Sequence, residues 1–206
     1  MLLPINSAKI IGISRHRLTT DGQGVTTLVA FNGCPLRCKY CINYHCWDPG
    51  EGEEYTPETL YEKVKIDQLY FLATRGGVTF GGGEPLLQGE FIKEFRALCG
   101  LQWHIVAETS LNLPFENLES IDPLLDGYIV DIKDMNPALY QAYTGKDNAV
   151  VLKNLEWLLQ HRDTNDIMVR IPHIPGYNTD QDVARSKELL CKMGVVNLDE
   201  FNYIIR

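Results

Sequence analysis

Short apolar strands alternate with amphipathic helices along most of this chain, and this alternation limits its possible folds more than any other feature. The first strand is expected at Val25–Phe31, whose sequence VTTLVAF is rich in β-branched residues. Repeated strand–helix units predict a parallel sheet with right-handed crossovers. The other strands are expected at Gly77–Phe80, Trp103–Thr109, Gly127–Ile132, Asp166–Ile171 and Glu200–Ile205.

Six such units are too few for a closed eight-fold barrel, so we expect an α/β fold, an open partial (β/α)6 barrel with a parallel sheet. The 206 residues are enough for one domain, spanning 1–206. Function is expected at the C-terminal ends of the strands. Thr56 is the expected N-cap of the first helix. The helices are predicted at Pro57–Leu72, Gln88–Leu98, Glu116–Leu125, Asn136–Tyr143, Ala149–His161 and Thr179–Met193.

The composition excludes several classes of partner. Formal net charge is −8 and no basic run occurs, which argues against nucleic-acid binding. No apolar run is long enough to span a bilayer, so no membrane association is expected. The first residues lack the features of a signal peptide. We therefore expect a location in the reducing cytoplasm, which suits free thiols.

Cys34, Cys38 and Cys41 form a C-x-x-x-C-x-x-C pattern directly after the first strand. Soft thiolates held this close select an iron–sulfur cluster or zinc. Three ligands leave one iron of a [4Fe–4S] cluster free to bind a small molecule, which is the interpretation that we favour. A zinc site with Cys46 or His45 as fourth ligand is the main alternative. A disulfide is less suitable, because three clustered cysteines leave an odd thiol.

Polar residues follow several other strands. A GGGEP sequence at 81–85 follows the second strand, and we interpret it as a ligand loop because glycines let a ligand approach the backbone. Asp131 and Lys133 are two residues apart on one strand and therefore project to the same face. Because buried charges need partners, this pair suggests a zwitterionic ligand or an ion. Arg170 either faces the same interior or forms a structural ion pair. Cys99 and Cys191 are expected to be core thiols.

Several motifs together resemble the radical S-adenosylmethionine (SAM) superfamily, and within it the activating enzymes of glycyl radical enzymes, especially the group that activates pyruvate formate-lyase. The resemblance runs from about Asp21 to the end of the chain. It rests on DGQG at 21–24, GCPLRCKYCIN at 33–43, WD at 47–48, VTFGGGEPL at 78–86, AETS at 107–110, DIK at 131–133 and IPG at 174–176.

The resemblance implies a role for each matching residue. The three cysteines would hold the cluster, and Tyr40 would lie beside the adenine of SAM. The loop of Gly82, Gly83 and Glu84 would receive the SAM amino group, and Lys133 its carboxylate. Arg170 would contact the ribose or carboxylate of SAM. A monovalent-cation site next to that carboxylate would use Glu108, Thr109, Asp131 and the carbonyl of Ile129.

The resemblance also implies the chemistry: reductive cleavage of SAM to a 5′-deoxyadenosyl radical, which abstracts a hydrogen atom. The implied partners are a glycyl radical enzyme and an electron donor such as flavodoxin or ferredoxin. Alternatives are a peptide or small-molecule substrate, activation of anaerobic ribonucleotide reductase, or a non-catalytic zinc- or cluster-binding module.

The chain departs from the family pattern at two positions that matter here. Gly81 stands where serine is usual, and Glu108 stands where aspartate is usual. The longer Glu108 side chain would displace an ion bound there. The chain also ends at Arg206, before segments found in relatives. We therefore expect the last strand to be a sheet edge that a partner covers.

Overall fold

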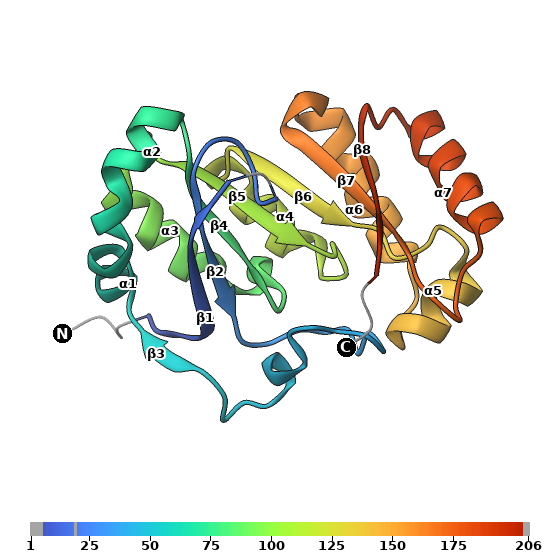
Figure 1. Cartoon of the computed structure of the whole chain (residues 1–206), viewed down its shortest axis with the longest axis horizontal. Coiled ribbons are helices and arrows are strands. Elements are labelled where there is room, and N and C mark those ends of the chain that lie inside the picture. Colours follow the sequence, from blue (N-terminus) through green and yellow to red (C-terminus); the bar gives the residue numbers. More distant parts are fainter. Residues whose placement is uncertain (1–5, 19, 204–206) are drawn as a thin grey trace.

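An open eight-stranded sheet forms the centre of the computed structural model, which describes residues 6–18 and 20–203. The strand order is β3-β1-β2-β4-β5-β6-β7-β8, so β3 and β8 are the two edges (Figure 1). The six strands from β2 to β8 in this order run parallel, which confirms the expected α/β fold and its open partial barrel. The strands are β1 (Ala8–Arg17), β2 (Thr26–Phe31), β3 (Glu53–Tyr55), β4 (Gly77–Gly82), β5 (His104–Thr109), β6 (Gly127–Asp131), β7 (Ile167–His173) and β8 (Asn197–Asn202).

The helices follow the outer side of the sheet from α1 at one end to α7 at the other (Figure 1). Between them and the strands lies one large apolar core, in which Phe80 and Trp103 both contact Phe95. Burial of such apolar surface is the main stabilising contribution to the fold. The helices are α1 (Pro57–Val64), α2 (Gln68–Thr74), α3 (Gly89–Cys99), α4 (Phe115–Ile121), α5 (Pro137–Thr144), α6 (Ala149–His161) and α7 (Asp180–Met193).

Two strands were not predicted. β1 and β3 precede and follow the cysteine loop, and β1 pairs antiparallel with both β2 and β3. The second half of β1 is the polar run Ser14–Arg17, whose side chains are exposed or only partly buried. No continuous apolar pattern therefore marks this strand. β3 is only three residues long. β1 is a strand because it pairs with β2, and β3 is one because it pairs with β1.

The helix predicted at Pro57–Leu72 is interrupted. α1 ends at Val64, a 3-10 turn spans Lys65–Asp67, and α2 then continues to Thr74. The interruption places the fully buried Asp67 carboxylate against the first two strands. The last strand lies three residues earlier than expected, at Asn197–Asn202, and positions 204 and 205 of the predicted strand lie outside the described residues.

Alternation along the strands separates the two faces of the sheet. Tyr128 and Val130 of β6 belong to the core beneath the helices, as expected, whereas Asp131 lies on the opposite, inner face. At the N-terminal end of the strands, the loop after β1 closes over this inner face. A Cβ on Gly22 would there lie 3.4 Å from the Cγ2 atom of Val106.

In the described part of the chain, no helix combines the length and the apolar character needed to cross a membrane.

Candidate functional site

The three cysteines lie on the loop that leaves β2, and backbone hydrogen bonds hold this loop in place. At its start, Gly33 N donates to Cys46 O over 2.8 Å. In its middle, Arg37 N donates to Thr144 O over 2.9 Å, at the C-terminal end of α5. The segment Cys34–Cys41 is therefore fixed at the C-terminal end of the parallel strands, where function was expected.

Cys46 brings a fourth thiol to this loop. It is 1% exposed and donates hydrogen bonds to Cys34 and Cys41. These hydrogen bonds lower the pKa of Cys34 and lower that of Cys41 to about 7. Burial instead raises the pKa of Cys38 to about 11. The pKa values of two of the three motif thiols are thus shifted toward the thiolate, which is the form that binds metal.

Cys38 packs into a small apolar cluster separate from the main core. Its buried members are Leu36, Cys38, Tyr143 and Ile174. This cluster joins the cysteine loop to α5 and to the segment after β7. The apolar wall limits the access of water to Cys38. An apolar shell of this kind would shield an iron–sulfur cluster from solvent and oxygen.

Tyr40 lies at the rim of the same cluster. Its hydroxyl donates to Pro175 O over 3.2 Å, and its ring centroid is 5.8 Å from that of Tyr177. The ring is therefore held between the cysteine loop and the IPG segment. The Tyr40 side chain is only partly buried, so a planar ligand can still contact its ring.

The glycine loop packs directly on the cysteine loop. A Cβ on Gly83 would lie 2.1 Å from the carbonyl oxygen of Gly33, and a Cβ on Gly82 would lie 2.6 Å from the Cβ of Ala30. Gly82 also has a φ of +86°, a conformation that favours glycine. Glu84 N donates to Gly33 O over 2.7 Å. These glycines therefore bring the two predicted ligand loops into contact.

The Glu84 carboxylate is committed to the protein. Its Oε1 atom accepts from the Thr109 hydroxyl over 2.6 Å, and its Oε2 atom accepts from the Ser110 backbone and hydroxyl over 3.0 and 2.7 Å. Burial raises the pKa of Glu84, and these hydrogen bonds oppose the shift. Glu84 thus attaches the glycine loop to the end of β5.

Lys133 lies just beyond the end of β6 and is buried, with 7% exposure. Its Nζ atom is 2.9 Å from Asp131 Oδ2 and 3.4 Å from the Tyr203 hydroxyl. Burial alone would lower the pKa of Lys133, but Asp131, Tyr203 and Cys38 together raise it well above its usual value. The ammonium is therefore a permanent positive charge beside the cysteine loop.

Arg170 faces the same interior from β7. Its Nη1 atom is 2.9 Å from Glu108 Oε1, and its Nε atom is 3.5 Å from Asp199 Oδ2. Its second terminal nitrogen donates to the carbonyl of Thr20, in the loop beneath the sheet. Burial and the nearby Asp131 raise the pKa of Glu108, and Arg170 opposes the shift. The structural ion pair considered from the sequence is therefore present.

The residues predicted to hold a monovalent cation lie together at the ends of β5 and β6, where Glu108 pairs with Ile129 in the sheet. Three of the four already have side-chain partners within the chain. Glu108 binds Arg170, Thr109 binds Glu84, and Asp131 binds Lys133.

Two other predictions concerned the fourth ligand of a zinc site and the burial of Cys99 and Cys191. Of the two proposed fourth zinc ligands, Cys46 contacts the motif thiols, whereas the exposed His45 ring packs on Tyr44 with a centroid distance of 4.0 Å. Cys99 is buried as expected. The prediction for Cys191 was wrong, because this thiol lies on the exposed side of α7.

Sequence patterns did not reveal two of the residues that complete the site, and they gave no role to Ser110 of the AETS motif. Tyr203 reaches Lys133 from just after β8, and Asp199 reaches Arg170 from within β8. Ser110 binds Glu84 twice. β8 reads NLDEFN, in which polar residues do not alternate with apolar ones, so no sequence pattern marked Asp199.

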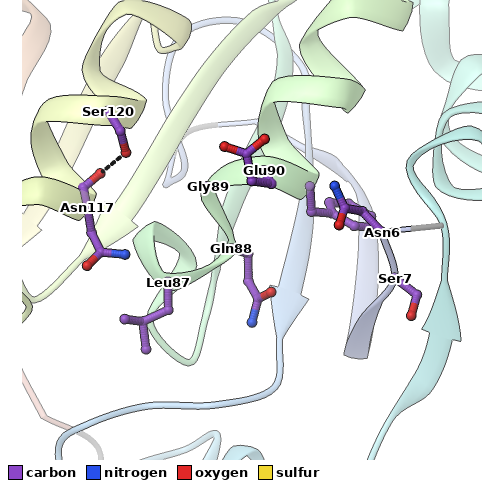
Figure 2. A pocket seen from close by; sticks show the side chains of 9 residues that line it. Asn6, Ser7, Leu87, Gln88, Gly89, Glu90, Asn117 and Ser120 are labelled. Atoms are coloured by element: carbon purple, nitrogen blue, oxygen red, sulfur yellow. Dashed lines mark hydrogen bonds between the residues drawn. The ribbon is translucent and has the colours of Figure 1, made fainter. Parts of the chain in front are cut away.

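A polar pocket of about 250 Å³ opens elsewhere, at the start of α3 (Figure 2). The hydroxyl of Ser120 donates to the carbonyl of Asn117 on one of its walls. None of the predicted site residues lines this pocket. Its lining residues are Asn6, Ser7, Leu87, Gln88, Gly89, Glu90, Phe91, Asn117 and Ser120.

Sequence comparison matches residues 28–190 to the Radical SAM superfamily. The pyruvate formate-lyase 1-activating enzyme of Escherichia coli K12 is 31% identical over 187 residues, which are 86% of this chain and 73% of that protein. The pyruvate formate-lyase-activating enzyme of Clostridium pasteurianum is 40% identical over 126 residues, or 61% of this chain, and these span only 53% of that protein. A (2S)-3-sulfopropanediol dehydratase activating enzyme of Klebsiella oxytoca is 34% identical over 151 residues, covering 69% of this chain and 46% of that protein.

Structural comparison supports the same fold at lower sequence identity. The structure of anSMEcpe with bound AdoMet covers 83% of this chain and 49% of its own, with a TM-score of 0.62 and 19% identity. A structure of TYW1 with a lysine-pyruvate adduct covers 87% of this chain and 65% of its own, with a TM-score of 0.61 and 18% identity.

Proposed function

Because the chain belongs to the radical SAM superfamily, we propose that it binds a [4Fe–4S] cluster through Cys34, Cys38 and Cys41 and activates a glycyl radical enzyme. The observation that carries this proposal is the contact between the two ligand loops. Glu84 N donates to Gly33 O, so the glycine loop lies against the start of the cysteine loop. A ligand bound to a cluster on one loop would therefore touch the backbone of the other.

The thiols support a cluster. Among residues 6–18 and 20–203, no three Cys, His, Asp or Glu side chains converge as ligands of a single metal ion. A [4Fe–4S] cluster makes a different demand, since each thiolate binds its own iron. A loop of three spaced thiols with an apolar wall at Cys38 suits that demand. Under this proposal Cys46 supports the thiolates through hydrogen bonds and is no ligand.

The side chains around the loop would bind and orient SAM. Lys133 offers an ammonium with three donors, so it can keep its contact with Asp131 while it binds the SAM carboxylate. The backbone of Gly82 and Gly83 would receive the amino group. The ring of Tyr40 would lie beside the adenine. We also propose that residues 1–206 act as one domain, since one sheet carries all these groups.

A cluster held by Cys34, Cys38 and Cys41 would supply the electron that cleaves the C–S bond of SAM, which would give methionine and a 5′-deoxyadenosyl radical able to take a hydrogen atom. The protein provides the orientation and the sheltered pocket for this reaction. In the proposed activase reaction the hydrogen comes from a backbone glycine of the partner, which keeps the unpaired electron. The electron donor would be a flavodoxin or a ferredoxin. We propose the reducing cytoplasm as the location, because free thiols persist there.

The activase assignment rests on the relatives at 31–40% identity, whose names state that they activate pyruvate formate-lyase. It can be tested with the anaerobically reconstituted protein, SAM, dithionite and a candidate glycyl radical enzyme. We expect 5′-deoxyadenosine to form together with a protein radical signal in electron paramagnetic resonance. The Cys38→Ala variant serves as the negative control.

Other outcomes are equally informative. Formation of 5′-deoxyadenosine at the same rate with and without each candidate partner, with no partner radical, would exclude the activase proposal and favour a peptide or small-molecule substrate. Absence of SAM cleavage in a protein that carries its full iron content would favour a non-catalytic cluster-binding module.

A further inference from the structure

Tyr203, the first residue after β8, contacts the buried Lys133 although 70 positions separate the two residues in the sequence. Lys133 Nζ donates to the Tyr203 hydroxyl over 3.4 Å and lies 5.7 Å from the centroid of the Tyr203 ring. A phenol oxygen accepts a hydrogen bond, and the face of the ring attracts a cation. Tyr203 is therefore a second partner of the ammonium, beside Asp131.

Contacts with three elements fix the position of Tyr203. Its backbone N donates to His173 O over 3.0 Å, at the end of β7. The ring centroids of Tyr143 on α5 and of Phe201 on β8 lie 5.9 and 5.7 Å from that of Tyr203. Aromatic rings at these distances stabilise each other. Because both the backbone and the ring are held, the hydroxyl has a defined position relative to Lys133.

The ammonium of Lys133 carries three N–H donors in a tetrahedral arrangement. One donates to Asp131 Oδ2 over 2.9 Å, and one donates to the Tyr203 hydroxyl. Two fixed donors set the rotation of the group about its C–N bond, so the third N–H keeps one direction. A donor that is already oriented loses less freedom when a ligand binds. The third donor is the one that remains for a carboxylate.

The Asp131 carboxylate offers Lys133 a competing arrangement. Its Oδ1 atom is buried and has no hydrogen-bond partner among the described residues. An unpaired buried acceptor is costly, and Lys133 is the charged donor that already lies at this carboxylate. Without the Tyr203 hydroxyl, we expect the ammonium to rotate toward Oδ1 and to use two donors on Asp131. The acceptor at Tyr203 opposes that rotation.

We propose that Tyr203 is a positioning residue, which keeps the third N–H of Lys133 directed at the carboxylate of SAM. This inference rests on the proposed function, in which Lys133 binds that carboxylate. Because Tyr203 acts through Lys133, its hydroxyl should strengthen the binding of ligands that carry the carboxylate and of no others. The pairing of β8 with β7, which brings Tyr203 to this place, thereby contributes to SAM affinity.

The first experiment is a double-mutant cycle on SAM affinity, measured by calorimetry with the anaerobically reconstituted protein. Tyr203→Phe keeps the ring and removes the hydroxyl. We expect it to weaken SAM binding about fivefold, and by less than about twofold in a Lys133→Met background. Tyr70→Phe, at an exposed tyrosine of α2, is the matched control and should leave SAM affinity unchanged. Unchanged affinity in Tyr203→Phe, or an equal loss in both backgrounds, would overturn the inference.

Decarboxylated SAM separates this inference from the proposed function. The analogue lacks the carboxylate, so the unmodified protein and Tyr203→Phe should bind it with dissociation constants that agree within about twofold. A loss of about fivefold for the analogue as well would show that Tyr203 shapes the pocket independently of Lys133, and would overturn the inference. Absence of SAM binding by the unmodified protein would instead count against the proposed function.

The third experiment needs no cofactor. The ammonium groups of the cluster-free protein, labelled with ¹⁵N-lysine, are observed by nuclear magnetic resonance, and the Lys133 signal is identified by its absence from Lys133→Met. We expect Tyr203→Phe to shift this signal and to speed its hydrogen exchange with water several-fold, because one of its two hydrogen bonds is lost. Tyr70→Phe should leave the signal unchanged. An unchanged Lys133 signal in Tyr203→Phe would contradict the positioning role.

Discussion

Asp131, the last residue of β6, and Lys133, two residues further on, form a buried ion pair with 2.9 Å between Nζ and Oδ2. The Lys133 side chain is 8% exposed. Buried charges remain ionised when partners compensate for lost hydration. Here Lys133 also lies near Cys38 and Tyr203, so the ammonium connects the inner charges of the sheet with the cysteine loop.

Replacing Lys133 with methionine should weaken SAM binding about tenfold or more. The SAM carboxylate loses a charge-assisted hydrogen bond, which contributes roughly 1.5–3 kcal/mol. Iron content should persist, because Lys133 is no ligand. Calorimetric titration with SAM measures the effect, and the exposed Lys93→Met is the control. Unchanged SAM affinity in Lys133→Met would show that the carboxylate binds elsewhere.

The cysteines divide into ligands and non-ligands. Alanine at Cys34, Cys38 or Cys41 should abolish iron loading, because each removes one of three ligands. Cys46→Ser, Cys99→Ala and Cys191→Ala should keep the iron and sulfide content of the unmodified protein. Iron and sulfide analysis after anaerobic reconstitution decides the matter. Retention of the brown colour by Cys38→Ala would refute the ligand assignment, and loss of metal in Cys46→Ser would favour a four-thiol site.

Glu84→Gln should destabilise the protein by about 1–3 kcal/mol. The amide nitrogen is a donor, and it would face the donors of Thr109 or Ser110 in a fully buried position. For a chain of this size such a loss lowers the melting temperature by several degrees. Differential scanning calorimetry of the cluster-free protein tests this, with the exposed Glu90→Gln as control. Equal melting temperatures for the two variants would contradict the anchoring role of Glu84.

Asp67→Asn should destabilise the protein by about 2 kcal/mol at pH 7, since the buried carboxylate binds Arg15, His16 and Thr27. The hydrogen bond from Arg15 is the largest cause that lowers the pKa of Asp67 in the folded protein. Its stabilising effect is therefore fully present above the unfolded pKa of about 4 and is lost as pH falls through the lower folded value.

The difference in unfolding free energy between Asp67→Asn and the unmodified protein should accordingly shrink as the pH falls below about 4. Denaturant unfolding of the cluster-free protein at pH 7, 5 and 3.5 measures it. The exposed Glu119→Gln should show no comparable difference at any of these values. A difference for Asp67→Asn that stays constant down to pH 3.5 would contradict the assigned cause.

The local sequence determined the parallel part of the sheet and its helices. The preference of β-branched residues for strands predicts β2, and the preference of threonine for N-cap positions predicts the start of α1 at Thr56. Both elements lie where expected. The spacing of the cysteines and the alternation around Asp131 likewise depend only on nearby residues. These features could be predicted because their physical causes act within a few positions of the chain.

Tertiary structure decided which residues complete those features. β1 is a strand because β2 and β3 pair with it, and the break at Asp67 places its carboxylate against residues 52 and 40 positions away in sequence, Arg15 and Thr27. The contact between Gly81 and Glu108 depends on the register of two neighbouring strands, which no local pattern specifies. Close packing and ion pairing act between residues brought together only by folding, and so they decided the partners of the predicted site residues.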